Sequence, residues 1–232
     1  MRIKLLCAGA CCALAIGAAS AASASAAPEF LHLGGPLTTT VFTGKSTGAV
    51  EIADPALGIK VHCGVETLEG LIEPGSTTAV EEVSIKLKMC LATVAAGGKI
   101  NKCKVRSAGS AFGAIRTKRL GGALIPVPPA EAADEVGLDL KAEVGTVITS
   151  LIFSPTTCGP PRVVEGSVIS EVAPKGPPEA IEKKLNSLAA PGPTQMIQFL
   201  PSGLKDTLAI GSTEAVLTGI VTLKFGETNE VT

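Results

Sequence analysis

Cysteines are the residues whose type and spacing point most clearly to a chemistry, and that chemistry is disulfide formation. The chain has seven cysteines, three of them within its first twelve residues. The other four are Cys63, Cys90, Cys103 and Cys158. An even number of cysteines in an exported protein predicts disulfides. Four cysteines allow three pairings, and the short spacing favours Cys90–Cys103, which leaves Cys63 to bond to Cys158.

Histidines offer little support for a metal site. The chain has two, His32 and His62. His62 lies beside Cys63 in a segment with strand character. Because neighbouring strand residues point to opposite faces, the two side chains do not easily coordinate the same ion. His32 lies in the N-terminal segment. We therefore expect neither a metal site nor a cofactor site.

Acidic residues leave an extracellular hydrolase as an alternative to a protein without catalysis. A two-carboxylate mechanism needs acids that converge across a cleft. The acids available for such a pair are Glu81, Glu82, Asp134, Glu135, Asp139 and Glu165. A Ser–His–acid arrangement would have to use His32 or His62, and neither is well placed. We expect no catalytic residues and no enzyme activity.

The N-terminal segment predicts export. Arg2 and Lys4 precede an apolar run from Leu5 to Ala19, and small residues follow. This order is typical of a secretory signal peptide over residues 1–26, with cleavage after Ala26. No later stretch is long enough to span a bilayer as a helix. We expect a secreted or extracytoplasmic protein.

Composition narrows the fold and the partners. Of the 232 residues 46% are hydrophobic, which is ample for a buried core, and only 3% are aromatic. The formal net charge of −1 gives no long-range attraction to nucleic acid or to an anionic membrane, and aromatic platforms for stacking bases are scarce. Nucleic-acid binding is therefore not expected.

Alternation of apolar and polar residues predicts an all-β fold. Val83 to Cys90 and Val136 to Val144 alternate strictly, and 146–153 and 162–172 also have strand character. Apolar residues recur at helical spacing only around 178–189, where we expect one short helix. About ten to twelve short strands and at most one helix predict an antiparallel β-sandwich or β-barrel.

The domain organisation follows from the same patterns. After the signal peptide we expect a loose lead-in over 27–36, a single disulfide-bonded β domain over 37–226 and a polar tail over 227–232.

The order of motifs resembles a group of exported, four-cysteine, β-rich hypothetical proteins of high-GC actinobacteria. The motifs are Cys63 with Gly70-Leu71-Ile72, Cys90, Cys103, Gly113–Thr117, Leu120–Leu124, Val136–Leu140, Phe153–Cys158, Val164–Ile169 and Gln195. The resemblance implies a β-rich fold and an extracytoplasmic location, and it implies no activity.

These observations favour an exported, non-enzymatic module that acts at or outside the cell envelope by binding or by structure. Its partner is unknown, and an envelope component or a small apolar ligand is possible. In the second case the ligand would occupy the interior of a barrel.

Overall fold

The computed structural model describes residues 30–32, 41–73, 78–96, 98–127, 136–173, 182–187, 197–198, 200, 202–225 and 229–231. These residues form sixteen strands and no α-helix, with a single 3-10 turn, η1 (Thr156–Cys158). The strands are β1 (Phe30–His32), β2 (Val41–Ser46), β3 (Val50–Asp54), β4 (Ile59–Ile72), β5 (Ala79–Ala96), β6 (Lys99–Arg106), β7 (Ala114–Arg116), β8 (Leu120–Pro126), β9 (Val136–Ala142), β10 (Val147–Ser154), β11 (Arg162–Ala173), β12 (Glu182–Ser187), β13 (Leu208–Ile210), β14 (Thr213–Glu214), β15 (Val216–Phe225) and β16 (Asn229–Val231). The prediction of an all-β fold is confirmed.

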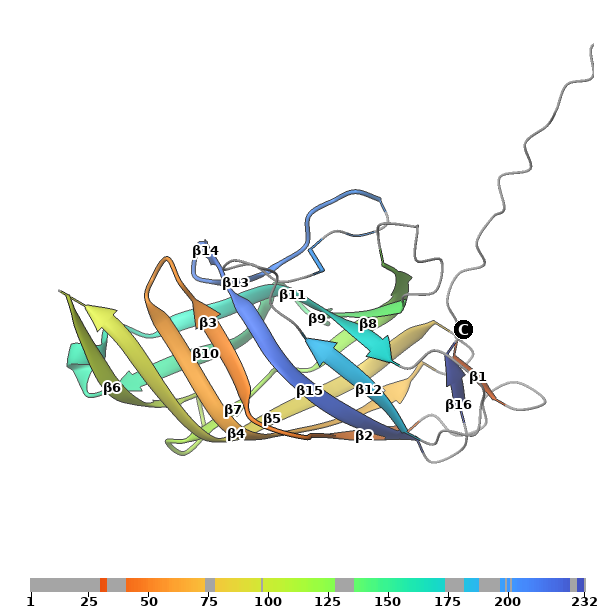
Figure 1. Cartoon of the computed structure of the whole chain (residues 1–232), viewed down its shortest axis with the longest axis horizontal. Helices are drawn as coiled ribbons and strands as arrows, with labels where there is room; N and C mark the ends of the chain where they lie inside the picture. The colour runs from red at the N-terminus through yellow and green to blue at the C-terminus, as the bar shows by residue number, and fades with distance from the viewer. Residues whose placement is uncertain are drawn as a thin grey trace, which may run out of the picture.

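One antiparallel sheet of fourteen strands contains all of these elements except β1 and β16. Its order is β10–β6–β5–β8–β9–β11–β12–β15–β2–β4–β3, and a further pairing of β4 with β5 joins the path back on itself. The sheet therefore wraps around an elongated interior (Figure 1). The closure is irregular rather than that of a regular barrel, because short strands replace others along the ring: β3 pairs with both β4 and β15, and β10 pairs with both β6 and β11.

The interior is filled mainly by aliphatic side chains, as the low aromatic content requires. The long strands β4 and β11 alternate more and less buried positions along much of their length, so that one face lines the core and the other lies toward solvent. Strand β9 differs, because all of its residues except Lys141 are buried. Phe42 and Phe225 are the aromatic pair in this core, with ring centroids 5.9 Å apart. The rest of the core consists of Val, Ile, Leu and Ala side chains together with Phe153 and the four disulfide-bonded cysteines.

Strands β4 and β5 change their inward face at the same point. Cys63 and Cys90 point inward on one side of the change, and Glu66 and Leu87 point inward on the other. Met89 takes a left-handed conformation there, with φ of 55°. Its side chain covers Gly64, where an added Cβ would lie 2.7 Å from the Met89 Cε. The flip leaves the side chains of Met89 and Leu91 both outside the sheet, each 65% exposed.

The predicted helix around 178–189 is wrong for the residues that the structure describes there. Glu182–Ser187 is strand β12, which lies between β11 and β15 and pairs with both. Lys183, Leu185 and Ser187 are buried while Lys184 is exposed, a period of two rather than 3.6. Hydrogen bonds to two neighbouring strands outweigh the weak local preference for a helix, which is a small effect per residue.

All four cysteines predicted to be bonded form disulfides, but the favoured pairing is wrong. Cys63 bonds to Cys90, and Cys103 bonds to Cys158. Cys63 and Cys90 lie directly opposite each other on β4 and β5, with Cα atoms 4.0 Å apart. Cys103 lies opposite Ala92, two residues away from Cys90 along β5. The strand register therefore decides the pairing, and closeness in sequence does not.

The segments expected to be a lead-in and a tail each contain a short strand. β1 pairs with β16 in an antiparallel two-stranded sheet, with Phe30 opposite Val231. Figure 1 shows this pair at one end of the elongated sheet. The remaining residues of both segments, and all of residues 1–26, lie outside the described residues.

Gly122 lies where β8 and β9 pack closely against each other. A Cβ added at Gly122 would lie 1.9 Å from the Asp139 carbonyl oxygen, a backbone atom that has little room to move. Gly122→Ala is therefore expected to lower the free energy of unfolding by about 2 kcal/mol, as overpacking of a tight site does. Gly48→Ala is the matched control, because nothing lies within 4 Å of its added Cβ. Urea unfolding of both variants measures the difference, and equal stabilities would contradict the close contact.

Candidate functional site: an interior cavity

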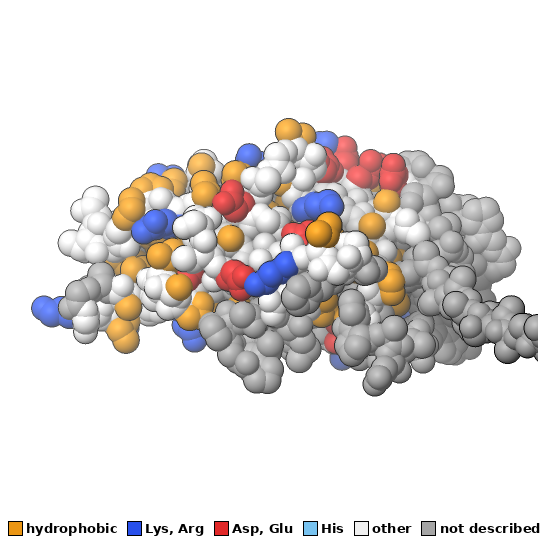
Figure 2. Space-filling model, turned by 90° about the horizontal axis from the view of Figure 1, so that it is seen from above, with side chains coloured by type: hydrophobic (Ala, Val, Ile, Leu, Met, Phe, Trp, Pro, Cys, Tyr) orange, Lys and Arg blue, Asp and Glu red, His pale blue; other side chains and the backbone are white. Residues whose placement is uncertain are grey.

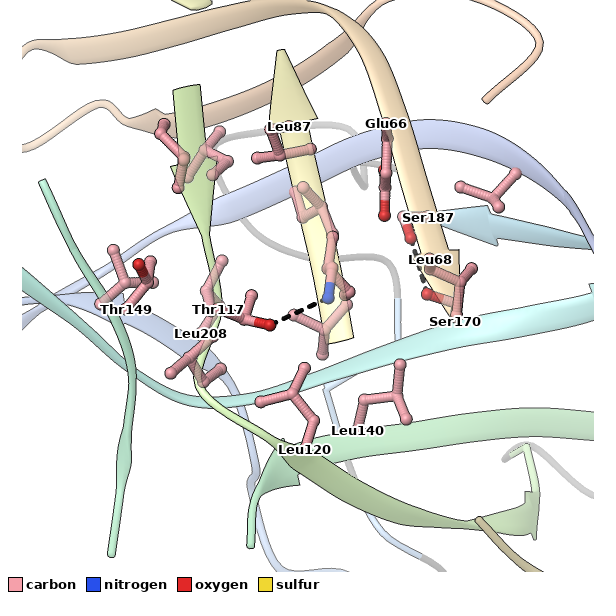
Figure 3. Close-up of a pocket in the computed structure, with 18 of the residues that line it drawn as sticks. Glu66, Leu68, Leu87, Thr117, Leu120, Leu140, Thr149, Ser170, Ser187 and Leu208 are labelled. Carbon is pink, nitrogen blue, oxygen red and sulfur yellow. Dashed lines mark hydrogen bonds between the residues drawn. The ribbon is translucent and has the colours of Figure 1, made fainter. Parts of the chain in front are cut away.

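The candidate site is a cavity enclosed by the sheet, shown in Figure 3. Its walls come from strands far apart in the sequence, from Ile52 on β3 to Val221 on β15. The inward faces of β4 and β5 form one wall, and those of β9 and β11 contribute to another. The space open to the centre of a water molecule is about 60 Å³. A single water needs about 10–15 Å³ on this measure, so the cavity has room for several waters or for a small molecule.

Aliphatic side chains make up most of the lining. Typical members are Leu68, Leu87, Ile115, Leu120, Leu140 and Val221. Each is buried, so the wall offers a small molecule dispersion contacts and few hydrogen-bonding groups. An apolar lining of this kind favours a ligand with a hydrocarbon body.

Hydroxyl groups in the lining already have partners within the protein. Thr117 Oγ1 accepts a hydrogen bond from the Ile85 N–H at 3.0 Å. Thr149 Oγ1 donates to the Arg116 carbonyl at 2.6 Å. Ser170 and Ser187 hydrogen-bond to each other through their hydroxyl oxygens, which lie 2.6 Å apart. Their hydroxyl oxygens can still accept a further hydrogen bond from an occupant of the cavity.

Glu66 is the ionisable residue of the cavity lining. It points inward from β4 and is only 5% exposed. In Figure 3 its carboxyl group points toward the side of the cavity where Ser170 and Ser187 meet. Burial raises the pKa of Glu66 from 4.5 to about 7, and no described residue contributes a hydrogen bond or charge that offsets it. A buried acid with a strongly shifted pKa in an apolar cavity is a candidate ligand-binding group.

The backbone on both sides fixes the position of Glu66. The Glu66 N–H donates to the Ser46 Oγ of β2 at 2.9 Å, and Glu66 lies opposite Leu87 in the β4–β5 register. The sequence carries a signal for this residue that the strand assignment missed. Glu66, Leu68, Gly70 and Ile72 share one face by period two, so the acid stands on the apolar side of its strand.

The acids considered for a hydrolase do not gather in this cavity. Glu81, Glu82 and Asp139 line a separate surface hollow beside β8 and β9. Glu82 forms an ion pair with Arg119 at 2.6 Å, and Asp139 lies 3.9 Å from the Lys141 ammonium. Burial raises the pKa of Asp139, and the negative charge of Asp206 raises it further. Glu82 therefore pairs with a cation at the surface, while Asp139 is buried on β9 and has only a distant ammonium group as its ionic partner among the described residues.

The other candidates Glu165 and His62 line neither this hollow nor the cavity. Glu165 lies on β11, where it can accept a hydrogen bond from Thr146 at 3.4 Å. His62 is exposed on the outer face of β4, opposite Glu51 and Leu91. His32 belongs to β1, and Asp134 and Glu135 lie outside the described residues.

No group of three or more His, Cys, Asp or Glu among the described residues is arranged to hold a metal ion. Within the described ranges, the structure contains no helix with the length and apolar character needed to cross a bilayer. The two disulfides are typical of an oxidising, extracytoplasmic environment.

Fold and site together define a class of protein: an all-β domain in which one disulfide-bonded sheet encloses an apolar cavity with a single buried acid. Comparison with models of known families, with curated proteins and with solved structures finds no match. Conclusions about function therefore have to come from the cavity and the surface themselves.

Proposed function

We propose that the protein is an exported, non-enzymatic binding module that holds a small, largely apolar molecule in its interior cavity. The observation that carries the proposal is the placement of one acid, Glu66, in a largely aliphatic cavity where no described residue forms an ion pair with it. A carboxyl group with only a structural role would be more stable in solvent or in an ion pair than buried among apolar side chains. A ligand with a hydrocarbon body and one polar group would satisfy both the lining and the carboxyl.

Export is supported by the signal-like residues 1–26 and by the resemblance to exported four-cysteine proteins. The two disulfides agree with an oxidising compartment. The size of the cavity, about 60 Å³ for water centres, limits the ligand to the scale of a single ring or a short alkyl chain. Release from the cell or retention in the envelope would both fit this role.

Charge on Glu66 would select the polar group of the ligand. Above its pKa of about 7 the carboxylate favours a cation such as an amine, and below it the neutral acid favours an uncharged ligand. Benzylamine and toluene have nearly the same body and differ in this group. We expect benzylamine to raise the melting temperature at pH 8.5 and toluene to raise it at pH 5.

Cavity filling tests whether these ligands bind inside. Val221 lines the cavity and is buried, so Val221→Phe would occupy the space and abolish stabilisation by both probes. Val163→Phe is the same substitution at a position 41% exposed on β11 and should leave binding unchanged. Thermal unfolding with and without each probe measures the effect.

Native mass spectrometry of protein from culture supernatant then reveals any bound molecule as a mass increment that denaturation removes. An empty protein that neither probe stabilises would refute the proposal.

A further inference from the structure

A basic and apolar patch covers the outer face of β4, β5 and β6 near the flip at Met89. The lysines and the histidine come from β4 and β6, and the apolar side chains come from β5 and β6. We call this surface the basic patch; it consists of Lys60, His62, Met89, Leu91, Ile100, Lys102 and Lys104. Several of these residues line a shallow hollow on the outside of the sheet.

The strand register fixes how the side chains of the basic patch are arranged. One row across the sheet runs from His62 through Leu91 to Lys104, and the next runs from Lys60 through Thr93 to Lys102. Leu91 therefore lies between His62 on one side and Lys104 on the other. It is 65% exposed, and Ile100, on the same face of β6 as Lys102, is 76% exposed.

Charge in the basic patch is of one sign and largely unpaired. Lys60 forms an ion pair with Glu51 at 2.9 Å. No ion pair joins Lys102 or Lys104 to another residue in the described ranges. On the face shown in Figure 2, acidic and basic side chains are interspersed, and acidic ones gather toward one end of the described part. The chain as a whole has a net charge of −1, so any attraction to an anionic partner is local to the basic patch.

We propose that the basic patch docks on an anionic lipid surface. Lysine ammonium groups near such a surface attract anionic headgroups electrostatically. Exposed aliphatic side chains between them can enter the boundary between headgroups and acyl chains. An acidic protein partner fits less well, because protein interfaces are depleted in Lys and rely on Trp, Tyr and Arg as anchors. The basic patch has none of these three residue types.

The basic patch is separate from the cavity, because it lies on the outer face of β4 and β5, whose inner faces line the cavity, and on β6, which contributes no residue to the lining. Leu91 and Lys104 point outward, while the neighbouring Ala92 and Cys103 are buried. Substitutions at outward positions can therefore change docking while the lining of the cavity stays as it is.

Co-sedimentation with lipid vesicles tests the proposal. The mature protein is mixed with vesicles of phosphatidylglycerol and phosphatidylcholine in equal amounts, or of phosphatidylcholine alone. We expect binding to the first and at least tenfold weaker binding to the second. Lys102→Glu together with Lys104→Glu should lower binding to the anionic vesicles at least tenfold.

Two further variants separate docking from a general effect of charge. Lys45→Glu with Lys184→Glu changes the net charge by the same amount on exposed positions of β2 and β12, both opposite Thr222 of β15, and should leave binding within about twofold. Leu91→Ser with Ile100→Ser should weaken binding severalfold even in high salt, where lysine contacts are screened. Equal binding to both kinds of vesicle, or equal losses in the two charge variants, would overturn the proposal. A third outcome would overturn it and favour an acidic protein as the partner. In that case the wild type would not bind vesicles but would be retained on immobilised polyglutamate, and the Lys102/Lys104 variant would not be retained.

Discussion

Glu66→Gln is expected to raise the free energy of unfolding by about 3 kcal/mol at pH 8.5 and to leave it nearly unchanged at pH 4. Burial raises the pKa of Glu66 from 4.5 to about 7. Each unit of difference between the folded and the unfolded pKa corresponds to about 1.4 kcal/mol. Gln has nearly the same shape and carries no charge, so it removes the penalty of burying a carboxylate.

The sign of the pH dependence follows from proton binding. Between pH 4.5 and 7 the folded protein retains the Glu66 proton that the unfolded chain has released. Because the folded state binds more protons over this range, its stability falls as the pH rises. The loss is complete above pH 7, and below pH 4.5 both states are protonated and there is no penalty.

Urea unfolding at several pH values measures the difference between wild type and variant. Glu69→Gln is a suitable control, because Glu69 lies on the same strand, points outward and forms an ion pair with Lys86 at 2.5 Å. An exposed ion pair contributes little, so this variant should differ from wild type by less than about 1 kcal/mol at any pH. If wild type and Glu66→Gln kept a constant difference from pH 4 to 8.5, the Glu66 carboxyl would not be desolvated as the structure shows.

A bound amine would reverse part of this behaviour. A cation beside Glu66 stabilises the carboxylate and lowers its pKa, which reduces the stability loss between pH 4.5 and 7. Benzylamine should therefore flatten the pH profile of the wild type and leave that of Glu66→Gln unchanged. The same group thus links the stability of the fold to the occupancy of the cavity.

Period-two alternation was enough to predict the fold class and several strands. Val136 to Val144 predicted β9, which spans Val136–Ala142, and the run over 162–172 predicted β11, which spans Arg162–Ala173. β11 alternates along much of its length because one face meets the core. The sequence of β9 alternates as well, but its residues from Val136 to Leu140 are all buried, polar Asp139 included. Strand β12 was missed because its strand character depends on partners: β11 and β15, one on each side.

The candidate site could not be predicted for a related reason. Residues of the cavity come from strands distributed between Ile52 and Val221, and only the closure of the sheet brings them together. Among the residues of the cavity, Glu66 has a recognisable pattern in the sequence, because it shares a strand face with the apolar residues Leu68 and Ile72. Its burial depends on the simultaneous flip of β4 and β5 at Gly64 and Met89, and the left-handed conformation of Met89 has no sequence signature comparable to that of a glycine.

The pairing of the cysteines could not be predicted from the sequence because it depends on the register of the strands. For the same reason the two disulfides test the fold. Cys103→Ala with Cys158→Ala is expected to lower the free energy of unfolding by about 4 kcal/mol. The bond joins residues separated by 55 positions, and loss of such a long loop constraint raises the entropy of the unfolded chain. Cys63→Ala with Cys90→Ala, across a separation of 27, should lower it by about 3.5 kcal/mol.

The connectivity itself can be read from peptides. Tryptic cleavage at lysine and arginine places each cysteine in a separate peptide, with ranges 61–86, 89–99, 103–104 and 142–162. Digestion without reduction should yield 61–86 linked to 89–99 and 103–104 linked to 142–162. A link between 89–99 and 103–104 would require Cys103 to lie opposite Cys90 instead of Ala92, a shift of two residues between β5 and β6. Such a shift would also displace Lys102 and Lys104 from the rows that hold Thr93 and Leu91, so the peptide map tests the basic patch together with the register of the sheet.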